Sequence, residues 1–102
     1  KKILFLFKLI KMKDKENAMK FIKDLKERQE RDKFNVSFKS DTKQNLKVRI
    51  LNVIREELIN ENLEQFIGEY TKQINLSDNT KGIYFSEIET NDGIINKKLI
   101  LQ

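Results

Sequence analysis

Apolar residues in the middle of the chain recur at helical spacing between Asp41 and Leu76. The first series has the i, i+4, i+7, i+8 spacing of one helix face and comprises Leu46, Ile50, Val53 and Ile54. The second series has a similar period and comprises Ile59, Leu63, Phe66, Ile67, Tyr70 and Ile74. At about 100° per residue, the two series face different sides of a straight rod. We therefore predict two helices, near 42–59 and 62–76.

Polar residues at both predicted helix starts favour this division. Asp41 is followed three residues later by Gln44, and Asn62 is followed by Gln65. This spacing resembles a capping box, in which short polar side chains satisfy the first free backbone N–H groups. The alternative is one long helix that lies between two layers of the protein.

The N-terminal third predicts one strand and one helix. Residues 2–10 are apolar on both faces from Ile3 to Phe7, which is typical of a central strand covered on two sides. Residues 14–33 predict a helix with a short apolar stripe that ends at Leu25. From residue 26 to 33 no side chain is apolar, so this half of the helix is expected to be solvated.

Two further segments have the period of β-strands. Residues 34–38 alternate apolar and polar side chains, which places Phe34, Val36 and Phe38 on one face of a strand. Residues 83–90 and 94–101 predict a β-hairpin, because Asn-Asp-Gly at 91–93 is typical of a tight turn. Both registers that we considered place Glu87 opposite a lysine, either Lys98 or Lys97.

The predicted element order is β-α-β-α-α-β-β. With only four strands, we expect one small sheet packed against helices, with the hairpin at its C-terminal end, which is an α+β fold. The 102 residues are enough for a single small domain spanning 1–102, with a modest core.

The composition removes several kinds of chemistry. The chain has no cysteine, so it has no disulfide, thiolate nucleophile or zinc–thiolate site. It also has no histidine, which is the usual general base and the commonest transition-metal ligand. We expect no enzymatic activity, no cofactor and no metal site. Carboxylates at Glu87, Glu89 and Asp92 are the residual candidates for catalysis, and a charged strand face is the simpler interpretation.

Charge is distributed unevenly between the two halves of the chain. Residues 1–50 hold 16 Lys and Arg against 7 Asp and Glu, whereas residues 51–102 hold 5 against 9. Such asymmetry indicates an anionic partner or an oriented protein contact. Lysine outnumbers arginine 17 to 4, which favours non-specific phosphate contacts over the reading of base edges. A genome rich in A and T would also supply many lysine codons.

The strongest candidate site is a basic patch around the strand 34–38 and the start of the next predicted helix. A helix N-terminus with nearby cations suits a phosphate group, although Asp41 places a negative charge at the same position. A solvated surface is the competing interpretation. The candidate anion-binding residues are Lys33, Lys39, Ser40, Lys43, Gln44, Lys47 and Arg49.

These observations favour a cytoplasmic, non-catalytic binding or regulatory protein. Its basic half would contact nucleic acid through phosphates, or an acidic surface on a protein that handles nucleic acid, and no membrane would be involved. The alternative is a protein–protein module, such as an inhibitor, an immunity factor or a homodimeric adaptor. That module would use the acidic helix 62–76 and the hairpin. A helix-turn-helix reader is disfavoured, because Glu64 and Glu69 would be repelled by DNA.

Overall fold

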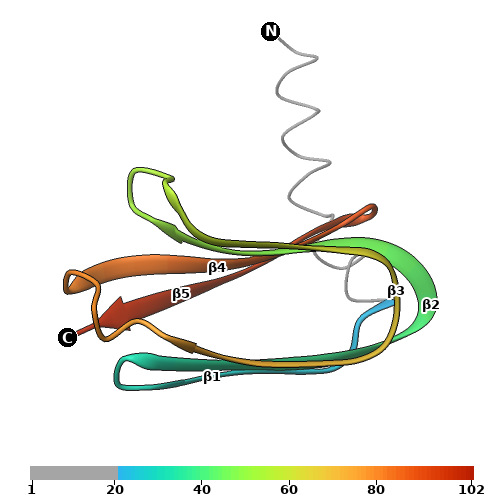
Figure 1. The fold of residues 1–102 in the computed structure, drawn as a ribbon, viewed down its shortest axis with the longest axis horizontal. Coiled ribbons are helices and arrows are strands. Elements are labelled where there is room, and N and C mark those ends of the chain that lie inside the picture. Colours follow the sequence, from blue (N-terminus) through green and yellow to red (C-terminus); the bar gives the residue numbers. More distant parts are fainter. Residues whose placement is uncertain (1–20) are drawn as a thin grey trace, which may run out of the picture.

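The computed structural model describes residues 21–102, and these residues form five antiparallel strands (Figure 1). The strands are β1 (Lys23–Glu30), β2 (Lys33–Asn52), β3 (Glu57–Asn75), β4 (Gly82–Thr90) and β5 (Gly93–Leu101). No helix is among the elements of this part of the chain, and therefore none that could span a membrane. The α+β prediction is wrong, and the fold is all-β.

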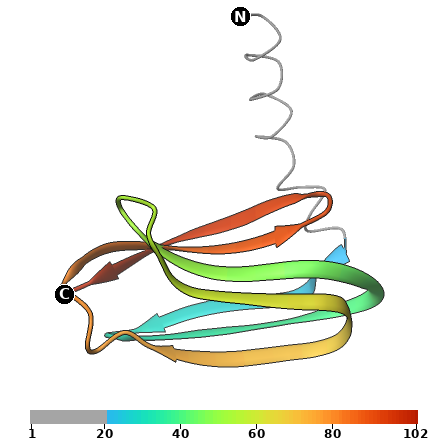
Figure 2. The same ribbon diagram turned by 45° about the horizontal axis from the view of Figure 1, so that its top comes forward.

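Two long strands fold over on themselves and divide the sheet into two layers (Figures 1 and 2). β3 pairs with β2 along its whole length, while β1 and β4 pair with the first and second halves of the other edge of β2. The first layer therefore contains β1 and the facing halves of β2 and β3. The second layer contains the other halves of β2 and β3, followed by β4 and β5.

The bend is made where both long strands lose regular pairing. In β2 the register shifts between Ser40 and Leu46. In β3, Gln65 has a φ of 47° and Gly68 a φ of 109°, a region of backbone conformation that glycine adopts without steric cost. The Ser40 hydroxyl donates to the backbone oxygen of Thr42 and accepts from the Gln44 amide, so it satisfies polar groups inside the bend.

The core lies between the two layers. Alternation along β2 over residues 34–40 and 46–50 places Phe34, Val36 and Phe38 in one layer opposite the inward residues of the other. At the bend, Phe38 stacks on Tyr70 with ring centroids 4.9 Å apart. The buried apolar residues that make up this cluster are Ile22, Phe34, Val36, Phe38, Leu46, Val48, Ile50, Tyr70, Ile74, Leu76, Tyr84, Ile88, Ile95, Leu99 and Leu101.

Charged side chains interrupt the alternation on β3 and explain why its period looked helical. Glu61 lies opposite Val48 and Lys72 lies opposite Val36, so both occupy inward positions, one in each layer. Their side chains form an ion pair of 2.6 Å between Lys72 Nζ and Glu61 Oε2. Because inward charges at a sheet edge discourage pairing with other chains, this ion pair protects β3 as well as joining the layers.

The prediction of a helix was wrong in all three places that can be compared. Residues 42–59 and 62–76 lie mostly in β2 and β3, and β1 occupies most of the second half of the predicted helix 14–33. In β1 the outward side chains are charged, which suits an edge strand exposed to solvent. The predicted strand 2–10 and residues 14–20 of the predicted helix 14–33 lie outside the described residues.

The two other strand predictions are confirmed. Residues 34–38 lie in β2 with the three apolar side chains inward, and residues 83–101 form the β4–β5 hairpin. The pairing of Thr90 with Gly93 makes Asn91 and Asp92 the two loop residues, and Thr90 Oγ1 accepts from the backbone N–H groups of Asp92 and Gly93. The predicted partner of Glu87 was wrong, because Asn96 lies opposite it on β5.

Candidate recognition surface

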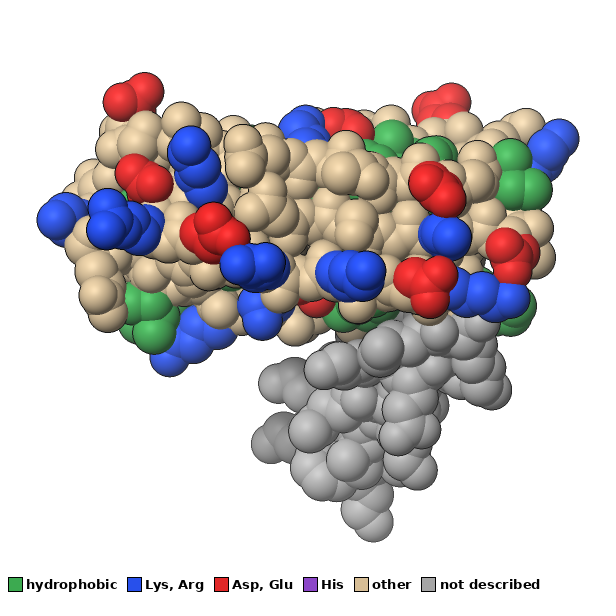
Figure 3. Space-filling model, turned by 90° about the horizontal axis from the view of Figure 1, so that it is seen from below, with side chains coloured by type: hydrophobic (Ala, Val, Ile, Leu, Met, Phe, Trp, Pro, Cys, Tyr) green, Lys and Arg blue, Asp and Glu red, His purple; other side chains and the backbone are tan. Residues whose placement is uncertain are grey.

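The outer faces of the two layers differ in chemistry. On the first layer the outward side chains are polar or charged, and basic and acidic groups intermingle, as the view from below shows (Figure 3). Lys39 lies near both Asp24 (3.7 Å) and Glu69 (3.3 Å). A hydrogen bond to the Glu69 carboxylate, followed by the charge of that group, raises the pKa of Lys39. This face is therefore a solvated surface in which opposite charges compensate.

The outer face of the second layer carries a cluster of arginines and carboxylates. Glu87 on β4 is almost fully buried, and its two oxygens contact Arg49 at 2.7 Å and Arg55 at 3.1 Å. Arg49 also lies 3.3 Å from Glu89 and 3.8 Å from Glu57. The cluster connects β2, β3, β4 and the β2–β3 turn, and it replaces the hydration that Glu87 loses on burial.

The β2–β3 turn is held in place above this face by its own hydrogen bonds. Asn52 Oδ1 accepts from the backbone N–H groups of Ile54 at 3.1 Å and Glu56 at 2.9 Å. Arg55 has a φ of 69°, an uncommon conformation for a residue with a side chain. Since the Arg55 side chain bonds to Glu87, this conformation ties the turn to β4.

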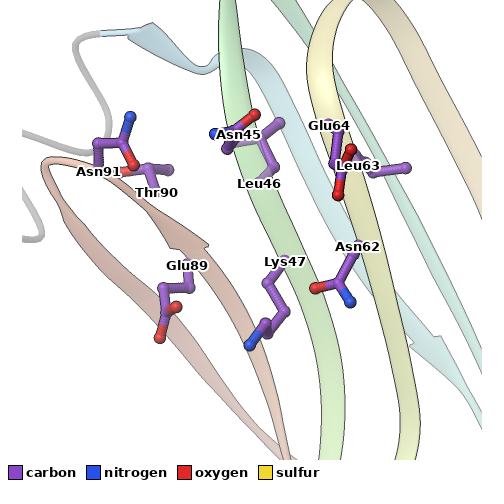
Figure 4. Close-up of a pocket in the computed structure, with 9 residues that line it drawn as sticks. All are labelled: Asn45, Leu46, Lys47, Asn62, Leu63, Glu64, Glu89, Thr90 and Asn91. Atoms are coloured by element: carbon purple, nitrogen blue, oxygen red, sulfur yellow. The ribbon is translucent and has the colours of Figure 1, made fainter.

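A small hollow opens at the bend end of the second layer (Figure 4). Its volume is about 220 Å³, and it lies between β2, β3 and the β4–β5 turn. Lys47 points between Glu89 and Asn62 (Figure 4). The hollow is lined by one cation, two carboxylates and several amides. Its charge therefore favours neither an anionic nor a cationic ligand. Within residues 21–102, no three Asp or Glu side chains gather as a metal site would require.

The structure does not bring the predicted anion-binding residues together. Lys33 and Lys39 belong to the outer face of the first layer, whereas Lys47 and Arg49 belong to the outer face of the second. Arg49 is engaged by carboxylates, so it is not a free cation.

The remaining predicted residues lie in the bend between the layers. Ser40 is buried, Gln44 donates its amide to Ser40 and to the backbone oxygen of Phe21, and Lys43 is exposed. A single basic patch is therefore absent from these seven positions, and their anion binding stays a prediction.

Arg49, Glu87 and Glu89 were named from the sequence, but their proximity was not predicted, although the sequence carries a pattern that indicates it. Arg55 and Glu57 were missed. Residues 46–50 alternate apolar and basic side chains, and residues 87–89 place an apolar residue between two acids. In the structure these segments are neighbours, with Lys47 opposite Glu89 and Arg49 opposite Glu87. A period of two would have predicted a basic row beside an acidic row. Arg55 gave no such indication, because its role depends on the shape of the turn.

Comparison with known proteins identifies the family of this domain. Residues 30–102 match the model of a family described as the secretion system C-terminal sorting domain, and no curated protein matches. Domains of this family mark cargo proteins that are sorted to the type IX secretion system and exported. The expected cytoplasmic location and the expected role in nucleic-acid binding or regulation are therefore wrong. Because the match covers well over half of the sequence, the chain belongs to the family of secretion system C-terminal sorting domains.

Proposed function

We propose that this domain is a folded export signal that components of the secretion machinery recognise through the outer face of its second layer. The domain acts by protein–protein contact and performs no catalysis. One observation carries the choice of face. The family match begins at Glu30, so it leaves out nearly all of β1 but contains every strand of the second layer. A property shared by the family is most simply located in the part that the match contains.

The chemistry of the second layer supports this choice. A partner needs a surface with fixed geometry, and the cluster around Glu87 fixes β2, β4 and the β2–β3 turn relative to one another. Side-chain networks of this kind reduce the conformational freedom that binding would otherwise have to remove. The first layer offers mainly exposed charges in compensating pairs, which contribute little to affinity.

The proposal is tested by export of a reporter. The full chain is fused to the C-terminus of a folded reporter in a bacterium that has a type IX secretion system, and reporter activity is measured in cells and medium. We expect the fusion to be exported and the reporter alone to be retained. Retention of the fusion, with the domain shown to be folded, would contradict the proposal.

A matched pair of charge reversals tests the choice of face. Lys47→Glu alters the outer face of the second layer, and Lys26→Glu alters that of the first, and neither lysine has an ionic partner within residues 21–102. We expect Lys47→Glu to reduce export and Lys26→Glu to leave it unchanged. The opposite result would assign recognition to the first layer.

A further inference from the structure

β5 is the edge strand of the second layer, and part of its outer edge is unpaired. Among the described strands it pairs only with β4. The side-chain amide of Gln29 bonds to both backbone groups of Ile100, at 2.6 and 3.2 Å, so these groups point away from β4. Because backbone groups alternate in direction along a strand, those of Ile94, Asn96 and Lys98 also point away from β4. No described residue hydrogen-bonds to them, so residues 94–98 form an open edge of β5.

The contact at Ile100 indicates which kind of group this edge accepts. The primary amide of Gln29 donates to the carbonyl oxygen of Ile100 and accepts from its N–H group. A peptide strand beside β5 makes the same pair of bonds at every second residue. The Gln29 amide therefore substitutes for a neighbouring strand at one position, and the open β5 edge offers the equivalent positions without a partner.

The open β5 edge belongs to the part of the domain that matches the family. The match includes all of β5 but begins at Glu30, so it leaves out Gln29 and nearly all of β1. An edge strand presents a row of free donors and acceptors, which is a template for a strand from another chain. A strand added to β5 would also extend the outer face of the second layer, which we propose as the recognition surface.

Lysines along the open β5 edge indicate the charge of the strand that it accepts. Lys98 is exposed on the outer face, Lys97 is half-buried on the inward face, and β5 contains no acid. Neither lysine has an ionic partner among the described residues. On β1, Glu30 contacts Arg28 at 2.7 Å, and Glu27 interacts with another group. The free charge of β5 is therefore positive on both faces, which complements a strand with acidic side chains.

The same lysines disfavour other occupants of this edge. Two copies of β5 in contact would bring four lysines into one short interface, and like charges destabilise a strand pair. An apolar strand would bury the charge of Lys97 without a partner. The open β5 edge is thus closed to indiscriminate association and suits a strand that brings carboxylates.

We infer that the open β5 edge is a strand-addition site for an extended, acidic segment of a protein of the export machinery. The segment pairs with the backbone groups of Ile94, Asn96 and Lys98, and its carboxylates contact Lys97 and Lys98. The site ends before Ile100, because Gln29 occupies that position. The inference rests on the proposed function and names the kind of partner and the kind of contact.

Substitutions at Asn96 test the backbone contact in reporter fusions to the full chain. Asn96→Pro removes an N–H group that points away from β4, a position at which an edge strand tolerates proline. We expect export to fall about tenfold, with a cooperative thermal transition retained. Asn96→Ala is the matched control, because it keeps the N–H group, and its export should be normal. Export of the unchanged fusion together with normal export of folded Asn96→Pro would overturn the inference and leave the proposed function intact.

Two further measurements do not depend on the proline variant. Lys98→Glu should lower export at least about threefold, and Lys98→Arg should preserve it. A photoreactive residue at position 96 should form an adduct with an export component in exporting cells, and one in place of Thr71, which is exposed on the first layer, should not. Export without an adduct at position 96 would overturn the inference. A dimer that Asn96→Pro abolishes would assign the edge to a second copy of the chain and would also overturn it.

Discussion

Gln29 on β1 connects the two layers, because its side-chain amide hydrogen-bonds to both backbone groups of Ile100 on β5. Its Nε2 donates to the Ile100 carbonyl oxygen at 2.6 Å, and its Oε1 accepts from the Ile100 N–H at 3.2 Å. β1 and β5 are the edge strands of different layers, and within residues 21–102 these two strands do not pair with each other through backbone hydrogen bonds. One side-chain amide therefore takes the place of a neighbouring strand at this point.

Replacement of this amide should destabilise the domain. We expect Gln29→Ala to lower the free energy of unfolding by about 1–2 kcal/mol, because two backbone groups lose their partner. The variant should also associate more readily, since the end of the β5 edge at Ile100 also becomes available for pairing. Urea unfolding and light scattering measure the two effects. Gln73→Ala is the control, because the Gln73 amide donates to the side chain of Asn35 at the surface, and an equal loss there would contradict the role of Gln29.

The ion pair between Glu61 and Lys72 predicts that each single substitution destabilises the domain and that the double substitution restores most of the stability. Glu61→Leu or Lys72→Met alone should cost about 1 kcal/mol, because one partly buried charge is left without its counterion. The double variant should regain most of that stability, since both inward positions become apolar. A double-mutant cycle from denaturant unfolding gives the coupling. Additive losses would show that the two side chains do not interact in solution.

The buried cluster predicts a larger loss than any exposed ion pair. Glu87→Gln leaves the mostly buried Arg49 without its nearest counterion, so it should lower the free energy of unfolding by about 3 kcal/mol. Glu30→Gln removes the exposed contact with Arg28 and should cost less than about 0.5 kcal/mol. Thermal unfolding of the two variants measures the difference. Equal effects would mean that the cluster is hydrated.

The raised pKa of Tyr70 predicts that the domain loses stability in alkaline solution. Burial, followed by the negative charge of Glu61, raises the pKa of Tyr70 above its ordinary value of 10.0. Below pH 10 the side chain is neutral in both folded and unfolded chains, so its contribution is fully present. Above pH 10 the unfolded chain ionises first, and stability falls as pH rises. Stability measured between pH 8 and pH 11 should fall less in Tyr70→Phe than in the unchanged protein, and parallel curves would contradict this assignment.

The folded unit should extend beyond the part that matches the family. Ile22 precedes β1 and the matched segment, yet it is buried in the core. Ile22→Ala should therefore lower the free energy of unfolding by about 2–4 kcal/mol. The neighbouring Phe21 is 41% exposed, so Phe21→Ala should lower it by less than about 1 kcal/mol. Denaturant unfolding measures both, and equal small losses would place the start of the fold at β1.

A strand was predictable from the sequence only where its alternation of apolar and polar residues ran without interruption. Residues 34–38 and the hairpin were predicted as strands, because nothing interrupts Phe34, Val36 and Phe38, and a tight turn marks the hairpin. In the long strands the bend near Ser40 and Gly68 shifts the register. On β3, charges also occupy inward positions at Glu61 and Lys72. These interruptions left apolar residues three and four positions apart, which is also the spacing of a helix.

The candidate surface was only partly predictable for a related reason. The sequence presents Glu87 and Glu89 as paired acids and Arg49 as a cation, but it predicts separate sites for them. Their proximity follows from the antiparallel pairing of β2 with β4, which joins residues about forty positions apart. Local periodicity carries no information about that pairing.

Residue types and short-range pattern were enough to establish the C-terminal hairpin, the apolar face of residues 34–38 and the absence of thiol and imidazole chemistry. Those features depend on neighbours within a few positions. The fold class, the compensation of the basic half by acids and the position of the open β5 edge emerged only from the packing of the strands. Each of these depends on which distant strands pair, because an inward charge such as Glu61 is stable only where its partner Lys72 faces it from the other layer.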